Sequence, residues 1–229
     1  MPVQTSGVEF ADVIVGDGPV VTSSAQASVV DVTYYDGASG DKLQEGTALW
    51  DAAMLKQQAP GMEAVLTCVT EGSRVVASLP DGAGGTVVAV VDVLYTALPK
   101  AEGHDVFNTA NNLPSVVRAP DGRPGVIIPD GAAPTKTVVE TLIEGEGDVV
   151  GDGVPLYQAT AVGWNDRAVQ NTTWDGVAPV GLDALPAEVV TAVQKATVGS
   201  QLLVVIPADG DATAFVVDVL GVIPPELLG

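Results

Sequence analysis

The apolar and polar positions along the chain change their spacing in the same order twice. In each half, extended runs rich in valine and threonine come first, a short segment with apolar residues at helical spacing follows, and two more extended runs come last. The helical segment is clearer in the second half. There Pro186 suits a first helical position, Val189 and Val193 share one face, and Gly199 ends the run.

The corresponding segment of the first half runs from Pro60 to Val69 and ends before Gly72. Its apolar residues at helical spacing are Met62, Val65, Leu66 and Val69. Each half therefore predicts one helix lying across an antiparallel sheet, which is an α+β arrangement.

Three short sequence matches, collinear and 126 to 129 positions apart, indicate that the two halves are copies. The first match pairs 13–18 (VIVGDG) with 142–147 (LIEGEG), and the second pairs 69–76 (VTEGSRVV) with 196–203 (ATVGSQLL). The third is the run VVDVL, which occurs at 90–94 and again at 216–220. We therefore expect a first domain at 1–98 and a second at 135–229.

A connector rich in proline and glycine separates the copies at 99–134. Its prolines are Pro99, Pro114, Pro120, Pro124 and Pro129. Proline fixes φ and removes a backbone donor, so an extended or turn-rich segment is expected here. The apolar run 126–128 needs cover, which favours a connector that lies on a domain and contributes a strand to it.

Charge excludes several classes of function. The chain has 9 Lys and Arg against 29 Asp and Glu, a net charge of −20, which would repel nucleic acid and anionic membrane surfaces. With 47% hydrophobic residues, it should still fold and bury apolar cores. By segment, the charge is −9 over 1–98, −1 over 99–134 and −10 over 135–229, so the acidity belongs to both copies and the connector is the exception.

Other candidate chemistry gives little reason to expect a metal or a cofactor. His104 is the single histidine and lies in the connector, so a histidine metal cluster or a catalytic triad is not expected. The G-x-G runs lack the third glycine and the helix of a dinucleotide loop, and the EF-hand pattern is absent, although weak surface calcium binding stays open. Cys68 is interpreted as a buried structural thiol. Trp50, Trp164 and Trp174 are core residues or parts of an exposed recognition patch.

The repeat resembles a known family over most of the chain. The residues that carry the resemblance are 16–21 (GDGPVV), 30–34 (VDVTY), the helix, and 215–220 (FVVDVL). They look like a pair of FK506-binding-protein (FKBP)-type peptidyl-prolyl isomerase domains, and the connector 113–125 resembles that of tandem actinobacterial lipoproteins of this family. The resemblance implies a twisted antiparallel sheet wrapped around one short helix in each domain. It also implies an apolar pocket with an aromatic floor, which favours the twisted prolyl amide over the planar one.

Carried over residue by residue, the family's pocket is eroded in both copies. The first copy keeps Tyr34, but has Leu43 and Gln44 for the Phe-Asp pair, Ala59 for the backbone donor, Met62 for the tryptophan floor and Ala89 for the last-strand aromatic. The second copy keeps Phe215, but has Ala159 for the tyrosine, Gln170 and Asn171 for the pair, Pro186 for the donor and Val189 for the floor. The pocket candidates are Tyr34, Leu43, Trp50, Met62, Trp174, Val189 and Phe215, and no catalytic residue is assigned.

Three functions remain open on this evidence. The first is a degenerate isomerase homologue that binds proline-containing polypeptide or partner proteins, in the manner of a chaperone, with weak or no turnover. The second is an active isomerase with a pocket rebuilt from residues such as Tyr34, Trp50 and Met62. The third is a structural surface protein that self-associates through sheet edges. No cofactor and no membrane span are expected, and the resemblance implies an extracytoplasmic lipoprotein whose signal region would precede Met1.

Overall fold

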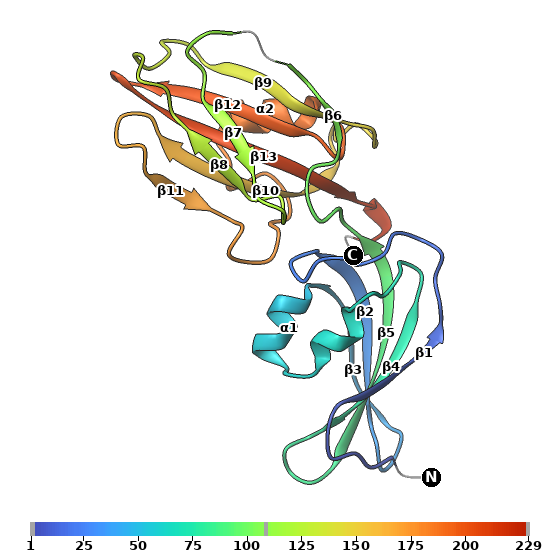
Figure 1. Cartoon of the computed structure of the whole chain (residues 1–229). Coiled ribbons are helices and arrows are strands. Elements are labelled where there is room, and N and C mark those ends of the chain that lie inside the picture. The colour runs from blue at the N-terminus through green and yellow to red at the C-terminus, as the bar shows by residue number, and fades with distance from the viewer. Residues whose placement is uncertain (1–2, 108–109, 228–229) are drawn as a thin grey trace. The chain divides into compact units, whose positions relative to one another are not determined.

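The computed structural model describes residues 3–107 and 110–227, and the chain divides into two compact units, Met1–Ala97 and Leu98–Gly229. The first unit is a five-stranded antiparallel sheet in the order β1-β4-β5-β2-β3, with helices inserted between β3 and β4 (Figure 1). Its strands are β1 (Glu9–Ile14), β2 (Ser28–Asp36), β3 (Lys42–Trp50), β4 (Arg74–Pro80) and β5 (Thr86–Thr96). Its helices are α1 (Ala52–Gln58) and the 3-10 helix η1 (Met62–Leu66).

The second unit has the same sheet with one strand added at an edge. The order is β11-β10-β13-β12-β9-β6, and α2 (Ala187–Lys195) lies between β11 and β12 in the chain. The strands are β6 (Gly103–Asp105), β9 (Val138–Gly145), β10 (Val154–Gly163), β11 (Val169–Thr172), β12 (Gln201–Ala208) and β13 (Asp211–Ile223). A separate hairpin, β7 (Ser115–Arg118) with β8 (Pro124–Ile127), and the 3-10 helix η2 (Pro225–Leu227) complete the unit.

Strand register repeats between the two units residue for residue. Ile14 pairs with Arg74 as Ile143 pairs with Gln201, and both strand pairs then skip one residue at the same place. The central pairs agree as well, since Asp31 lies opposite Asp92 where Gln158 lies opposite Asp218. The duplication indicated by the sequence matches is therefore a duplication of the whole sheet, including its bulges.

The helix expected from Pro60 to Val69 is wrong in extent. Only the 3-10 helix η1 forms there, because Gly61 before it and Cys68 after it both adopt the left-handed region, at φ 99° and φ 60°. In the second copy α2 begins at Ala187 with Pro186 as its cap residue, close to the expected start.

The α-helix of the first unit lies about ten residues before the expected one. Asp51 caps it, because its carboxylate accepts the N–H of Met54 at 2.6 Å. The sequence of α1 (AAMLKQQ) consists of good helix formers, and the helix stops at Ala59 because the residue before a proline is driven out of the helical region.

Both faces of the second sheet are covered. Alternate residues of β12 point in opposite directions, so Leu202 and Val204 pack with α2 whereas Leu203 and Val205 pack with the hairpin side. The hairpin and the chain after it contribute Val116, Val126 and Ile128 to this second cluster. The apolar run 126–128 therefore lies on the sheet, and the segment expected to be a connector belongs structurally to the second unit.

The three basic residues of this segment hold it in place. The Lys100 ammonium donates to the carbonyl of Pro120 at 3.0 Å, and the Arg118 guanidinium donates to the carbonyl of Ala101 at 2.9 Å. Arg123 donates to the Trp174 carbonyl at 2.8 Å and to the Asp175 carboxylate at 2.7 Å. The basic residues that make this segment nearly neutral therefore all bind groups within the second unit. Over the described residues, no helix combines the length and the apolar character needed to cross a bilayer.

Candidate functional site

A glycine-centred clasp occupies the first repeated motif in each unit. In the first unit the Thr70 hydroxyl donates to the Gly16 carbonyl at 3.0 Å, and the Ser73 hydroxyl accepts the Gly16 N–H at 2.9 Å. In the second, Thr197 donates to the Gly145 carbonyl at 2.6 Å and Ser200 accepts the Gly145 N–H at 3.1 Å.

Only glycine fits at the centre of this clasp. A Cβ on Gly16 would collide with the carbonyl oxygen of Glu71, and one on Gly145 would collide with that of Val198. The N–H groups of Gly18 and Gly147 donate to those same two carbonyls, at 3.2 and 3.0 Å. These two G-x-G runs therefore join distant parts of the backbone through long-range hydrogen bonds, and they are not the local turns that the sequence indicated.

Each unit carries one aromatic residue at the same point of the helix-facing sheet surface. Tyr34 lies opposite Ala89, and the equivalent pair in the second unit is Ala161 opposite Phe215. The large and small members have exchanged strands, so the volume of the pair is nearly conserved. This register also corrects the sequence alignment, because the counterpart of Tyr34 is Ala161, two residues beyond Ala159.

Both aromatics are half-buried and pack against the core on the helix side. Burial raises the pKa of the Tyr34 phenol, which therefore stays protonated at neutral pH. Tyr34 and Phe215 are thus the pocket candidates that combine an apolar body with an accessible edge.

The other helix-side candidates lie inside the cores. Met62 is 2% exposed and Val189 is fully buried, each beneath the helix that carries it. Trp50 ends β3 and is 9% exposed within the same core as Met62. Leu43 is 56% exposed at a bulge in β3, where the register passes from Gln44 to Lys42. Met62, Val189 and Trp50 are therefore core residues, and Leu43 lies at the surface.

The position before the helix, where the family resemblance implies a backbone N–H that binds substrate, has no N–H free to do so at Ala59 or Pro186. The N–H of Ala59 caps α1 by donating to the Leu55 carbonyl at 2.8 Å. The equivalent position in the second unit is Pro186, which has no N–H.

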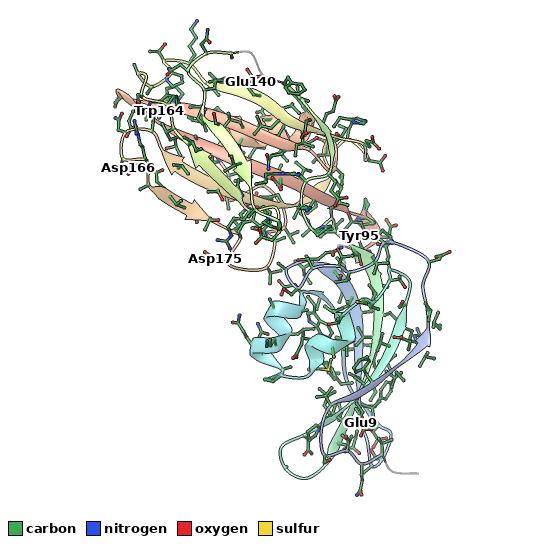
Figure 2. The ribbon with its side chains drawn as sticks, viewed as in Figure 1. Glu9, Tyr95, Glu140, Trp164, Asp166 and Asp175 are labelled. Carbon is green, nitrogen blue, oxygen red and sulfur yellow. The ribbon has the colours of Figure 1, made fainter. Side chains whose placement is uncertain are left out.

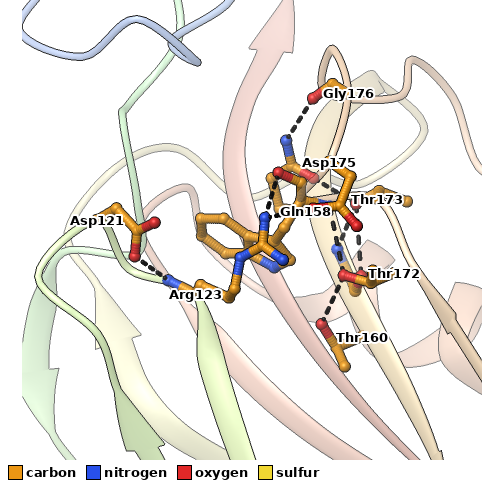
Figure 3. Close-up of polar contacts among 10 residues, drawn as sticks. Asp121, Arg123, Gln158, Thr160, Thr172, Thr173, Asp175 and Gly176 are labelled. Carbon is orange, nitrogen blue, oxygen red and sulfur yellow. Dashed lines mark hydrogen bonds and ion pairs between the residues drawn. The ribbon is translucent and has the colours of Figure 1, made fainter. Parts of the chain in front are cut away.

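Trp174 belongs to a different neighbourhood. It follows β11 and lies against the turn of the hairpin, where a Cβ on Gly122 would come within 3.0 Å of the indole ring. Figure 3 shows the polar contacts around it, with the Arg123 guanidinium at the Asp175 carboxylate and the Thr173 hydroxyl donating to Gln158. The indole N–H is buried without a hydrogen-bond partner. Figure 2 labels Trp164 at the other end of the unit, where its indole N–H donates to the Gly131 carbonyl at 3.0 Å.

A buried carboxyl, not singled out in the sequence, lies beneath the start of the second unit. Asp218 is 1% exposed and accepts hydrogen bonds from the Gln201 side chain at 2.7 Å and the Ala101 N–H at 3.0 Å. Burial raises the pKa of Asp218, and the two hydrogen bonds and the nearby Arg118 partly offset that rise.

The equivalent position in the first unit has the opposite character. Asp92 pairs with the Arg74 guanidinium through two contacts of 2.6 and 2.9 Å at the surface. The repeated run VVDVL therefore places one aspartate in a partly exposed ion pair and buries its copy.

The remaining features are the clefts, the clusters of acidic side chains and Cys68. Clefts of about 460, 440 and 280 Å³ lie in the second unit, and the seven pocket candidates do not line them. Among the residues that the structure describes, no three His, Cys, Asp or Glu side chains gather closely enough to hold a metal ion. Cys68 is exposed, not buried as expected, and adopts φ 60° after η1.

Comparison with known proteins adds a structural likeness. No family profile and no curated protein sequence matches the chain. A similar solved structure is that of the three FKBP domains of wheat FKBP73, with 11% sequence identity, 95% of each chain covered and a TM-score of 0.37.

Proposed function

We propose that this chain is a tandem pair of degenerate FKBP-type domains that binds proline-containing polypeptide or a partner protein, with weak or no prolyl isomerase activity. The proposal rests on the sequence resemblance and on the duplicated antiparallel sheet with a helix on one face. The observation that supports this proposal most is the lack of a free backbone donor before the helix. The Ala59 N–H is already bonded to Leu55, and Pro186 has none.

Loss of the aromatic floor acts in the same direction. Met62 and Val189 are aliphatic and buried, so they fill the space between helix and sheet and offer a prolyl ring no aromatic surface. Rotation about a prolyl bond faces a barrier of about 18–20 kcal/mol, and only groups that favour the twisted amide lower it. A site without a backbone donor and without an aromatic floor can do little to lower this rotation barrier.

Tyr34 and Phe215 supply the remaining means of binding. Each presents part of an aromatic ring at the surface beside the helix, where an apolar side chain or a prolyl ring of a client can pack. Such contacts hold ground state and transition state alike, which gives affinity without turnover.

The test is a prolyl isomerase assay on a short proline-containing peptide, with binding of the same peptide measured by calorimetry. We expect turnover near the uncatalysed rate. Phe215→Ala should weaken binding roughly fivefold, the equivalent of about 1 kcal/mol of lost apolar contact. Phe107→Ala is the matched control, because that phenylalanine is 94% exposed.

Phe215→Leu keeps most of the buried volume and separates a contact effect from a folding defect. Turnover far above background that is abolished by Met62→Ala or Phe215→Ala would favour the active isomerase with a rebuilt pocket. Undiminished peptide binding in both Tyr34→Ala and Phe215→Ala would remove these residues from the site.

A further inference from the structure

The outer edge of β9 in the second unit is filled by an added strand. β6 pairs antiparallel to it, with Gly103 opposite Gly145, His104 opposite Glu144 and Asp105 opposite Ile143. One backbone bond lies beyond each end of this pairing, both 2.9 Å long: the Val106 N–H donates to the Leu142 carbonyl of β9, and the Glu102 N–H donates to the Gly199 carbonyl just before β12. The second unit thus shows how an extended segment docks on this edge.

The same edge of the first unit is an edge of its sheet. β1 is the counterpart of β9 in register, so Val13, Ile14, Val15 and Gly16 correspond to residues 142–145. All six residues of β1 are exposed. Val13 within it and Val15 just after it expose 61% and 75% of their surface. An exposed apolar edge of this kind is a template for strand addition.

The β1 edge of the first unit keeps the glycines that lie beneath β6 in the second unit. Gly199 is buried because Glu102 lies over it, and a Cβ there would collide with the Glu102 carbonyl. Its counterpart Gly72 is exposed, and an added Cβ would meet only the Cα of Gly16, at 3.5 Å. The first unit therefore keeps the glycine-lined approach that the second unit uses to admit a backbone.

The edge also specifies the chemistry of its occupant. In the second unit a Cβ on Gly103 would collide with the backbone of Glu144, so the docking segment needs glycine at that point. The next residue, His104, places its Nε2 2.8 Å from the Glu146 carboxylate. The counterpart of Glu146 is the exposed Asp17.

We propose that the β1 edge of the first unit binds an extended segment of a partner polypeptide in which glycine is followed by a basic residue. The segment adds antiparallel to β1, with its glycine against Gly16 and its basic side chain at Asp17. This site uses the sheet edge and is independent of the aromatic residues of the proposed function.

A second copy of the chain is a poorer occupant. Pairing two β1 edges would bring together the exposed acidic residues Glu9, Asp12 and Asp17 of both copies. A basic segment instead meets an acidic unit in a chain of net charge −20.

The probe is a synthetic peptide of residues 100–107 with lysine in place of His104, titrated into the full chain. Amide hydrogen exchange should show new protection at Val13 and Val15. The same peptide with valine in place of glycine should not bind, because its Cβ would meet the edge backbone. Asp17→Asn should weaken binding about two- to fivefold, as for an exposed ion pair, whereas Asp12→Asn serves as the matched control.

Several outcomes would overturn the proposal. These are no binding at millimolar peptide, equal binding of the valine peptide, or protection confined to the second unit. A dimer detected by light scattering, with β1 protected in the absence of peptide, would assign the edge to a second copy. Loss of peptide binding on Phe215→Ala would place the peptide at the aromatic site, so failure here is distinguishable from failure of the proposed function.

Discussion

Asp218 holds a carboxyl group in a place that its copy Asp92 does not share. The two residues lie at equivalent register positions, yet Asp92 pairs with an arginine in solvent and Asp218 is covered by the residues around Ala101. Since burial raises the pKa of Asp218, the folded protein holds this proton more tightly than the unfolded chain does.

The sign of the pH dependence follows from that shift. Above the ordinary carboxyl pKa the unfolded state binds fewer protons at this site, so the free energy of unfolding falls as pH rises toward the raised value. We expect the stability of Asp218→Asn, measured relative to wild type by urea unfolding, to increase as pH rises above the ordinary carboxyl pKa and to level off once pH exceeds the raised pKa of Asp218. The control Asp183→Asn removes an equal charge at an exposed position. A relative stability that is flat or falls with pH would contradict this assignment.

At the scale of elements, α1 depends on one cap. Asp51 is 2% exposed and satisfies the Met54 N–H at the start of a helix only seven residues long. Helices of this length are marginal by themselves, so the cap and the packing of Leu55 hold α1 in place.

Asp51→Ala should therefore destabilise the first unit by about 1–2 kcal/mol, because it removes the cap and leaves the N–H without that acceptor. Asp51→Asn keeps an acceptor oxygen and should recover most of this loss. Chemical denaturation of the full chain, followed by amide exchange in 52–58, measures both variants. Equal stability of the alanine and asparagine variants would show that the cap contributes little.

The sequence predicted the elements that are defined by local repetition and missed those defined by distant contacts. Collinear matches around Gly16 and Gly145 indicated the duplication because the clasp needs glycine, threonine and serine at fixed places. Periodicity predicts a helix at 60–69, but Gly61 and Cys68 adopt the left-handed region and confine it to η1, whereas the seven residues of α1 are too few to give a periodic signal. The run VVDVL could not reveal which aspartate is buried, since the cover is supplied by residues more than 100 positions away.

The candidate site was predictable in part. Tyr34 and Phe215 each pack against the helix-side core of their own unit, whereas Met62 and Val189 lie inside those two cores and Trp174 lies against the hairpin. Cavity formation depends on side-chain volumes across the whole core, which local sequence does not specify.

At the scale of the molecule, the two copies of the sheet differ in the segments that pair with their edge and cover their outer face. In the second unit the segment 98–134 supplies an edge strand and a hairpin over the outer face, whereas no strand among the described residues pairs with the equivalent edge of the first unit. A folding unit of the second half therefore begins near Leu98, not at residue 135.

A fragment of residues 98–229 should fold cooperatively, whereas 135–229 should bind a hydrophobic dye and exchange its amide protons rapidly. The shorter fragment lacks Val116, Val126 and Ile128, which cover Leu203, Val205 and Val216. Circular dichroism and amide exchange of the two purified fragments provide the measurement. If 135–229 is as stable as 98–229, the hairpin is dispensable to the core.

The contrast between the Arg74–Asp92 pair and the buried Gln201–Asp218 pair also limits how the two copies can exchange sequence in evolution. Recombination within the gene would move short tracts from one repeat to the other. A tract that carried arginine into position 201 would bury a guanidinium under the hairpin, and one that carried glutamine into position 74 would remove the partner of Asp92. The copies can keep the same backbone register, but selection should keep residues 74 and 201 different.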